Sequence, residues 1–323
     1  MALQASGAIS LDDMHVEVGG TSGTTCSLND ADIRALISVG DSGQQSIQQY
    51  YGVSSETNLP TGGSQVNGQV QLKQITASSY ISSGETLRVP SNMWVWSDST
   101  SVAALIIDIS CTVINDGKII GKGGAGGNGH YNLVRTGYAG GPAINVTASG
   151  VTITNSSGAY IAGGGGGGGS QSDYSDPGDG HAGGGGGAGG GAGGTGRVNS
   201  YYWQGGVGGA LNASGANGGN GNANAGKGGG SGGGGGGLYY GGGGGGRILP
   251  GVGGNSGNTG AGGSAGNAAV SPGSEVWRPA GGGGGWGAAG ALGGGRFSGG
   301  AGGAAITGTS RTLNNSGTIY GST

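Results

Sequence analysis

The residues best suited to chemistry lie in one acidic stretch between two glycine runs. Asp173, Asp176 and Asp179 recur at every third residue, and His181 follows them. On a helix with three residues per turn these carboxylates would share one face, which is an arrangement that suits Ca²⁺. The spacing matches neither the EF-hand loop nor the Gly-Gly-x-Gly-x-Asp repeat, and Pro177-Gly178-Asp179-Gly180 also reads as a turn. We therefore expect solvated carboxylates that are available to a partner and no metal, with a Ca²⁺ site as the alternative.

Catalysis and cofactor binding find no support in the remaining residues. The three histidines, His15, His130 and His181, are far apart in the sequence. Gly-x-Gly-x-x-Gly occurs many times, but 93 glycines produce it by chance. No strand–turn–helix frame with a phosphate-binding lysine accompanies it. We expect a protein that is not an enzyme and that needs no cofactor.

Aromatic and charged side chains that interrupt the glycine-rich sequence are the better candidates for function. Tyr, Trp and Arg offer large contact areas at low entropic cost, which is why recognition loops favour them. Capping of the open ends of a glycine scaffold is the alternative role for any single residue. The candidate receptor-binding residues are Tyr131, Tyr138, Asp173, Tyr174, Asp176, Tyr201, Tyr202, Trp203, Tyr239, Tyr240, Arg247, Trp277, Arg278 and Phe297.

Glycine runs separate these candidates and must position them. Residues 163–169 are seven consecutive glycines, and similar blocks occupy 183–187, 232–237, 241–246 and 281–285. Such runs are usually flexible linkers, because ordering a glycine costs more entropy than ordering any other residue. Here the blocks are mixed with alanine and aromatic residues, which favours packed polyglycine-II helices that pair through their backbones. Collagen is excluded, because it needs glycine at every third position and many prolines, whereas this chain has seven.

Three short segments near the start share one layout. A β-prone pair precedes Ser10, Ser27 and Ser46, which lie 17 and 19 residues apart, and each serine can cap a helical turn. We expect a helix over residues 28–36 behind Ser27. With few apolar residues, this module should order against a partner or a fellow subunit. The candidate attachment residues are Ile9, Leu11, Leu28, Ile33, Leu36, Tyr50 and Tyr51.

The region from residue 69 to residue 120 alternates apolar and polar residues, which predicts a small all-β domain. Trp94 and Trp96 share a parity within one strand, so we assign them to its core or rim. A second repeat follows: residues 112–121, 152–161 and 313–321 each consist of a strand, a turn with asparagine and a second strand. We interpret each copy as a β-hairpin at the base of the glycine region.

Charge and hydropathy limit the classes of partner. A net charge of -3 with 8% charged residues excludes a concentrated basic surface for nucleic acid. No apolar stretch is long enough to span a membrane, and the first residues do not form a signal peptide, so we expect synthesis in a cytoplasm and no membrane insertion. Two cysteines in separate segments are expected to be free thiols.

The chain resembles two groups of phage proteins. The opening repeats, with Ala8-Ile9-Ser10-Leu11, Ser27-Leu28-Asn29-Asp30 and Tyr50-Tyr51-Gly52, look like the N-terminal attachment segment of many bacteriophage tail and tail-fibre proteins. The glycine blocks with aromatic loops are similar to the receptor-binding tip adhesins of T-even-type phages. That resemblance implies a sandwich of polyglycine-II helices with host-recognition loops at its distal end.

These observations predict a mainly β and irregular fold in five parts. The parts are an attachment module (1–56), a linker (57–68), a small β domain (69–120), a polyglycine-II domain with recognition loops (121–310) and a C-terminal strand or hairpin (311–323). We expect a receptor-binding adhesin on the virion tail or tail-fibre tip. Its expected partners are other tail proteins and a bacterial surface protein or glycan. The alternative is a structural glycine-rich protein of a tail, matrix or cell wall.

Overall fold

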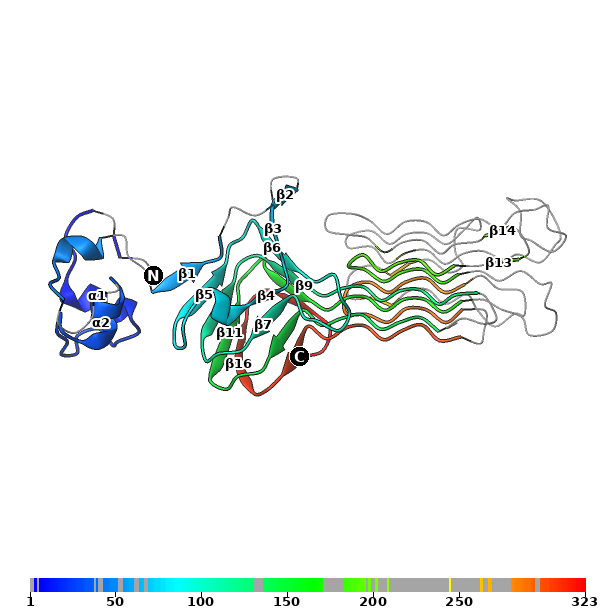
Figure 1. The fold of residues 1–323 in the computed structure, drawn as a ribbon. Helices are drawn as coiled ribbons and strands as arrows, with labels where there is room; N and C mark the ends of the chain where they lie inside the picture. The colour runs from blue at the N-terminus through cyan, green and yellow to red at the C-terminus, as the bar shows by residue number, and fades with distance from the viewer. Residues whose placement is uncertain are drawn as a thin grey trace.

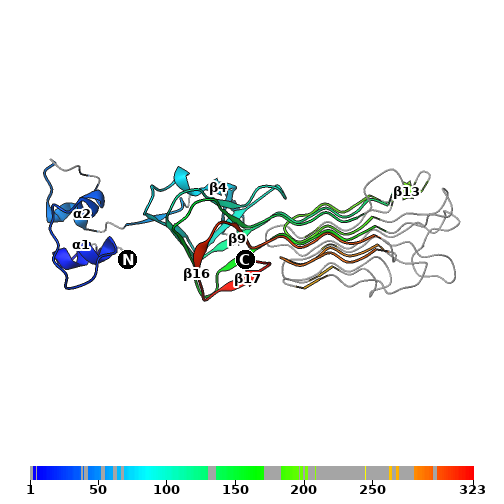
Figure 2. The same cartoon turned by 90° about the horizontal axis from the view of Figure 1, so that it is seen from below.

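The computed structural model covers all 323 residues and describes residues 3–4, 6–37, 39, 43–51, 55–60, 64–66, 69–129, 136–170, 183–195, 197–198, 201–202, 208, 244, 262–263, 267–268, 280–293 and 297–323. The chain is elongated: a small helical module is followed by a block of β-sheets and then by glycine-rich segments that run along the long axis (Figures 1 and 2). Strands greatly outnumber helices in the described residues, which confirms the mainly β prediction.

The N-terminal module contains α1 (Leu11–Glu17), α2 (Ala31–Ala35) and the 3₁₀ helix η1 (Ile47–Tyr50). The serine repeat has a common structural basis, because each serine N–H donates to the side chain three residues later. The acceptors are Asp13 for Ser10, Asp30 for Ser27 and Gln49 for Ser46, each at 2.7 Å. The helix predicted over 28–36 is shorter than expected. It begins at Ala31, because the Ser27–Asp30 pair closes a separate turn before it.

The module also has a small core of its own. Leu3, Met14, Ile33 and Tyr50 are buried together, and seven partly buried apolar residues pack around them. Ser55 ties the end of α1 to the chain that leaves the module, because its Oγ donates to the Glu17 carbonyl over 2.7 Å. The sequence had suggested that the module orders only against a partner, but the core shows that it also packs on itself.

The central part is a three-sided parallel β-solenoid. Apart from β2, each pairing in its three sheets is parallel. Four successive coils each give one strand to each sheet: β4–β6, β7–β9, β10–β12 and β15–β17. The strands are β1 (Glu56–Asn58), β2 (Ser64–Val66), β3 (Gln69–Lys73), β4 (Ile75–Thr76), β5 (Thr86–Val89), β6 (Met93–Trp96), β7 (Leu105–Ile107), β8 (Thr112–Asn115), β9 (Lys118–Ile120), β10 (Ile144–Val146), β11 (Val151–Asn155), β12 (Tyr160–Ala162), β15 (Ile306–Gly308), β16 (Arg311–Asn315) and β17 (Thr318–Tyr320), with the 3₁₀ helix η2 (Ala77–Ser79) after β4.

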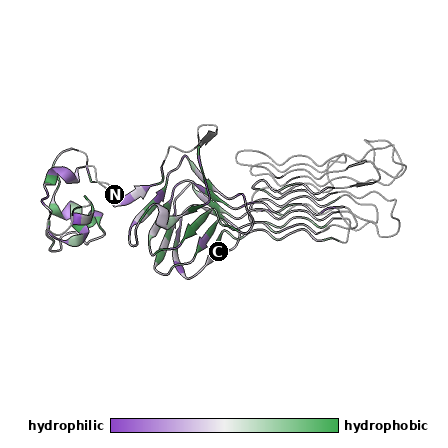
Figure 3. Cartoon of the chain, in the orientation of Figure 1, coloured by the Kyte–Doolittle hydropathy of each residue, from purple (hydrophilic) through white to green (hydrophobic). Residues whose placement is uncertain are grey.

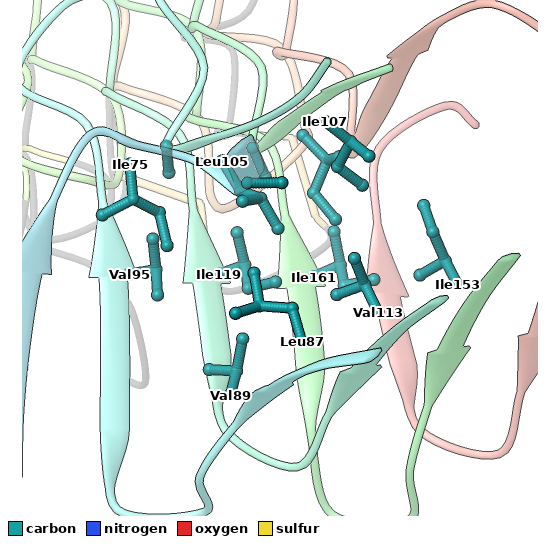
Figure 4. Close-up of a cluster of buried hydrophobic side chains, with 14 of the residues drawn as sticks. Ile75, Leu87, Val89, Val95, Leu105, Ile107, Val113, Ile119, Ile153 and Ile161 are labelled. Atoms are coloured by element: carbon teal, nitrogen blue, oxygen red, sulfur yellow. The ribbon is translucent and has the colours of Figure 1, made fainter. Parts of the chain in front are cut away.

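Apolar side chains from all three sheets fill the inside of the solenoid (Figure 4). Alternation along each strand explains this arrangement, since β11 buries Val151, Ile153 and Asn155 and turns the two residues between them outward. Because the coils are in register, equivalent residues of neighbouring coils lie side by side, as Ile153 does with Val113 and Leu313. Cys111 lies in this core as a free thiol whose pKa is raised to about 11 by burial.

An asparagine ladder runs along one corner of the solenoid. Asn115 Nδ2 donates to Asn155 Oδ1, and Asn155 Nδ2 donates to Asn315 Oδ1, each over 2.8 Å. Asn115 and Asn155 are fully buried, so these bonds pair the Nδ2 of Asn115 and both polar atoms of the Asn155 amide, which would otherwise be costly to desolvate, while Asn115 Oδ1 has no hydrogen-bond partner among the described residues. The ladder explains why each copy of the repeat carries asparagine at the same place.

The hairpin prediction for this repeat is wrong. The two strands of a copy lie in different sheets, and each pairs with the equivalent strand of the neighbouring copy. The asparagine turn is therefore a solenoid corner. The sheets also reach beyond residues 69–120, because β10–β12 and β15–β17 belong to them. Within the expected linker 57–68, β1 extends to Asn58 and pairs with β5, and β2 pairs with β3.

The glycine-rich segments leave and re-enter the solenoid at one corner. Residues 121–143 connect β9 to β10, and residues 163–305 connect β12 to β15. Both connections join the same two sheets. Apart from β13 (Arg197–Val198), β14 (Tyr201–Tyr202) and an isolated bridge, the described segments lie side by side as extended traces without helix or strand assignment (Figures 1 and 2). We call this part the glycine bundle.

Segment 163–169 is the centre of the glycine bundle, and its hydrogen bonds repeat at every third residue. Its N–H groups donate over 2.7–2.9 Å, and its carbonyls accept from N–H groups of other segments over 2.7–2.9 Å. Gly163 donates to the Tyr320 carbonyl, and the segment bonds to six surrounding stretches of the bundle. The donated bonds go to three stretches: to 138–141 from Gly164 and Gly167, to 185–188 from Gly165 and Gly168, and to 288–291 from Gly166 and Gly169. The accepted bonds come from three others, 124–127, 281–287 and 300–303.

Close packing makes glycine necessary in the inner segments. A Cβ on Gly165 would lie 2.1 Å from the carbonyl oxygen of Gly284, and one on Gly167 would lie 1.9 Å from that of Ala125. Both obstacles are backbone atoms. In the outer segment 121–129 the residues that carry side chains, Lys122, Ala125 and Asn128, are again spaced by three and are the partly exposed ones. Figure 3 shows the contrast between the solenoid, whose strands carry green and purple stretches, and the pale described segments of the bundle.

Candidate functional site

The end of the glycine bundle farthest from the helical module carries a short antiparallel pair, β13 (Arg197–Val198) and β14 (Tyr201–Tyr202) (Figure 1). Near this distal end, polar contacts and a tight bridge join neighbouring segments. Thr195 donates through both its N–H and its Oγ1 to Asn128 Oδ1, each over 2.9 Å. Gly293 and Phe297 form a β-bridge in which the Gly293 N–H donates to the Phe297 carbonyl over 2.9 Å. The distal end is therefore built on segments that the backbone lattice holds.

Four of the predicted receptor-binding residues lie in the described part of the chain. Tyr201 and Tyr202 form β14, and Phe297 is half-buried where the chain returns from Gly293. Tyr138 lies beside Ala125 and Gly167 in the glycine bundle. The others lie outside the described residues: Tyr131, Asp173, Tyr174, Asp176, Trp203, Tyr239, Tyr240, Arg247, Trp277 and Arg278, together with Asp179 of the alternative Ca²⁺ site. Within the described residues, no group of three or more His, Cys, Asp or Glu side chains is placed to hold a metal ion.

Tyr138 lies on the flank of the glycine bundle and not at a chain reversal. Its N–H donates to the Ala125 carbonyl over 2.8 Å, and its own carbonyl accepts from Gly167 over 2.9 Å. The lattice thus fixes its backbone on both sides, while the side chain stays 46% exposed. Tyr138 therefore lies away from the distal end, where the resemblance to tip adhesins implies the recognition loops.

An aromatic cluster that the sequence did not predict joins the solenoid to the bundle. Trp286 is 2% exposed, and its ring centroid lies 5.2 Å from that of Tyr160 and 5.8 Å from that of Tyr320. Trp94 meets the edge of Tyr160 at 6.0 Å, and Lys118 Nζ lies 4.8 Å above the Trp94 ring. The parallel register that pairs Lys118 with both Trp94 and Tyr160 could have revealed the cluster, but a hairpin interpretation hides it.

The C-terminal residues close this junction. The Tyr320 carbonyl accepts from the Gly163 N–H over 2.9 Å, and the Ser322 carbonyl accepts from Ala305 over 2.8 Å. Trp94, which was assigned to the core or rim, belongs to this junction, and Trp96 is half-buried at the end of β6. The last coil therefore holds together the two ends of the long glycine-rich connection.

The predicted attachment residues fall into two groups. Ile33 and Tyr50 are fully buried in the core of the module. Ile9, Leu11, Leu28, Leu36 and Tyr51 are only partly buried. Two apolar residues that the sequence did not single out are more exposed: Val16 at 46% and Ile47 at 47%. Val16 also lines a groove with Ile9, and Asp12 and Asp13 line the same groove.

The described residues form a parallel β-solenoid that carries a bundle of backbone-bonded glycine segments. A family model described as "Phage tail fibre adhesin Gp38" matches residues 55–231, which is more than half of the chain. The chain therefore belongs to the Gp38 family of phage tail fibre adhesins. It is a tail-fibre component of a virion and an adhesin, not an enzyme.

Two further comparisons complete the findings. A solved structure, the "Crystal structure of the gp37-gp38 adhesin tip complex of the bacteriophage S16 long tail fiber", matches 98% of this chain and 99% of its own chain, with 18% identity and a TM-score of 0.48. No curated protein matches the sequence. None of the helices in the described part of the chain is both long and apolar enough to cross a membrane.

Proposed function

We propose that this adhesin attaches the virion to a bacterial surface protein or glycan through aromatic residues at the distal end of the glycine bundle. The single observation that carries the proposal is the position of β14. Tyr201 and Tyr202 lie at the end of the molecule opposite to the helical module (Figure 1). An adhesin that is anchored at one end meets the host with the other end.

The scaffold of this proposal is a polyglycine-II sandwich. Its support is the three-residue period of the hydrogen bonds around segment 163–169, since a polyglycine-II helix has three residues per turn and no internal hydrogen bonds. A Cβ added to the glycines of segment 163–169 would collide with neighbouring backbone carbonyls, so these positions cannot carry side chains. Loops on such a base lose less entropy on binding than loops on a mobile chain.

The anchor of this proposal is the helical module, with another tail-fibre protein as its partner at the fibre tip. Its exposed apolar residues, Val16 on α1 and Ile47 on η1, are available to such a partner. Ile9 and Leu11 are partly buried against the core of the module, to which Ile33 and Tyr50 belong. The capped turns fix the positions of these side chains.

The test is adsorption of virions whose adhesin carries Tyr201→Ala, Tyr202→Ala and Trp203→Ala together. We expect adsorption to host cells to fall by at least tenfold, because truncating central aromatic contacts commonly costs 2 kcal/mol or more. The matched control is Val102→Ala, which truncates an exposed apolar side chain in the loop after β6, away from the distal end. Virions of normal composition that adsorb normally with the triple variant would contradict the proposed role of these residues.

A further inference from the structure

A groove runs along the flank of the glycine bundle where it meets the solenoid, away from the distal end. It has a volume of about 410 Å³. The turn after β6 forms one side, with Asp98 and Thr100, and the bundle forms the other, with Lys122, Ala125 and Tyr138. Pockets of this size are large enough for small ligands.

Tyr138 gives the groove an aromatic face that is already in place. Its side chain is 46% exposed, although its backbone N–H and C=O are both bonded within the lattice. The ring therefore stands on a rigid segment whose backbone does not need to be ordered on binding. An exposed tyrosine of this kind combines a flat apolar ring with a polar hydroxyl. The ring can stack against the C–H groups of a sugar, and the hydroxyl can form a hydrogen bond with a sugar hydroxyl.

The charged residues that line the groove are Lys122 and Asp98. Lys122 Nζ donates to the Gly190 carbonyl over 2.7 Å, which uses one of its three N–H donors. Asp98 is bound to Lys73 over 3.0 Å, and this bond lowers the pKa of the Asp98 carboxyl, so the acid is ionised at neutral pH. Because Lys73, which lies outside the lining, already pairs with Asp98, the ammonium of Lys122 is the lining charge that remains for a ligand, which favours a ligand with a negative charge.

We propose that this flank groove binds an anionic saccharide, with a sugar ring stacked on Tyr138 and its phosphate or carboxylate near Lys122. The inference rests on the proposed adhesin function, to which it adds a second contact with the cell surface. In this arrangement the distal end binds the receptor, while the flank groove binds the charged glycan that surrounds the receptor on the cell surface.

The test measures binding of purified acidic oligosaccharides to the full-length protein by calorimetry. One arm uses the phosphorylated core of bacterial lipopolysaccharide, and the other uses an acidic capsular oligosaccharide, which distinguishes the two sources. We expect millimolar or tighter binding in at least one arm, at least a tenfold loss with Tyr138→Ala, and retention with Tyr138→Phe and with Leu292→Ala.

Two results would overturn the inference: no binding in either arm, or equal binding by the wild type and Tyr138→Ala. Equal affinity for the core after its phosphates are removed would overturn the role of charge. The variant with Tyr201, Tyr202 and Trp203 replaced by alanine separates this site from the proposed function. It should bind the oligosaccharide normally even where it fails to adsorb, so the two hypotheses fail independently.

Discussion

The β-solenoid and the glycine bundle belong to one continuous chain and are stabilised by opposite means. The solenoid has a conventional interior, in which residues such as Leu87, Val113 and Ile153 are fully buried. The central segment 163–169 of the bundle has no side chains to bury, and its N–H and C=O groups bond to neighbouring segments instead. Packed apolar side chains exclude water from the interior of the solenoid, whereas closely packed, hydrogen-bonded backbone excludes it from the glycine bundle.

This difference gives the two regions opposite sensitivities. A core of side chains weakens when atoms are removed, because a cavity is left behind. A core of backbone weakens when atoms are added, because the neighbouring carbonyls are already at contact distance. A backbone core also does not depend on the side chains of the connecting loops, so those loops can vary in sequence while the scaffold stays the same.

The largest effect should come from adding one methyl group to the centre of the bundle, with Gly165→Ala. The new Cβ would lie 2.1 Å from the Gly284 oxygen and 2.7 Å from the Ala188 nitrogen, and neither atom can move without breaking lattice bonds. We expect a loss of about 3–5 kcal/mol in the free energy of unfolding, from overpacking combined with broken hydrogen bonds. Denaturant unfolding measures it.

Ala139→Ser is the control for this variant, because Ala139 is an exposed residue of segment 138–141. It should change stability by no more than about 0.5 kcal/mol. If Gly165→Ala were as stable as this control, the inner segments would not be packed as closely as the account requires.

Removing atoms from the solenoid should have the next largest effect. Ile153→Ala creates a cavity at the centre of β11 and should cost about 3 kcal/mol. Thr154→Ala changes the neighbouring side chain on the outer face of the same strand and should be nearly neutral. Thermal unfolding of the two variants compares the faces directly, and equal losses would show that the interior is not the stabilising side.

The smallest effect concerns an ion cluster outside both cores. Arg88 Nε lies 2.8 Å from Glu56 Oε2, and Arg88 also pairs with Asp116. The bond from Arg88 lowers the pKa of Glu56 below its ordinary value of 4.5 in the folded state. The stabilisation that the Glu56–Arg88 pair gives to the folded state is therefore complete above about pH 4.5, and it is lost as the pH falls through the lowered pKa of Glu56.

Glu56→Gln should remove this contribution, which we place at about 1 kcal/mol near neutral pH. The variant should also lose less stability than the wild type between pH 5 and pH 3, and melting temperatures across that range measure the difference. Parallel pH profiles for the two proteins would show that the pair does not link β1 to β5.

Several elements could be predicted from the sequence because their cause is local. The serine caps depend on residues three positions apart, and alternation in the strands shows which side chains face inward. The hairpins were predicted wrongly because strand–turn–strand looks the same in a hairpin and at a solenoid corner. Long-range pairing distinguishes the two, as in the bonds that join Asn155 to Asn115 and to Asn315, which lie 40 and 160 residues from it in the sequence.

The candidate site was harder to predict, because function there depends on where segments lie in the bundle. Tyr138 and Tyr201 look alike in sequence, each a tyrosine near glycine, yet the structure places one on the flank and the other at the distal end. Trp286 also resembles a loop aromatic, but it is buried at the junction. Nothing in the local sequence shows these differences.

The central claim is that the glycine bundle is a folded scaffold held by its backbone, and amide hydrogen exchange tests it most directly. The N–H groups of residues 163–169 are all hydrogen-bonded to other segments, so they should be protected as strongly as those of β11. Exchange of these seven glycines at the rate of an unstructured polyglycine chain would contradict the claim, because it would show that the segments are flexible linkers.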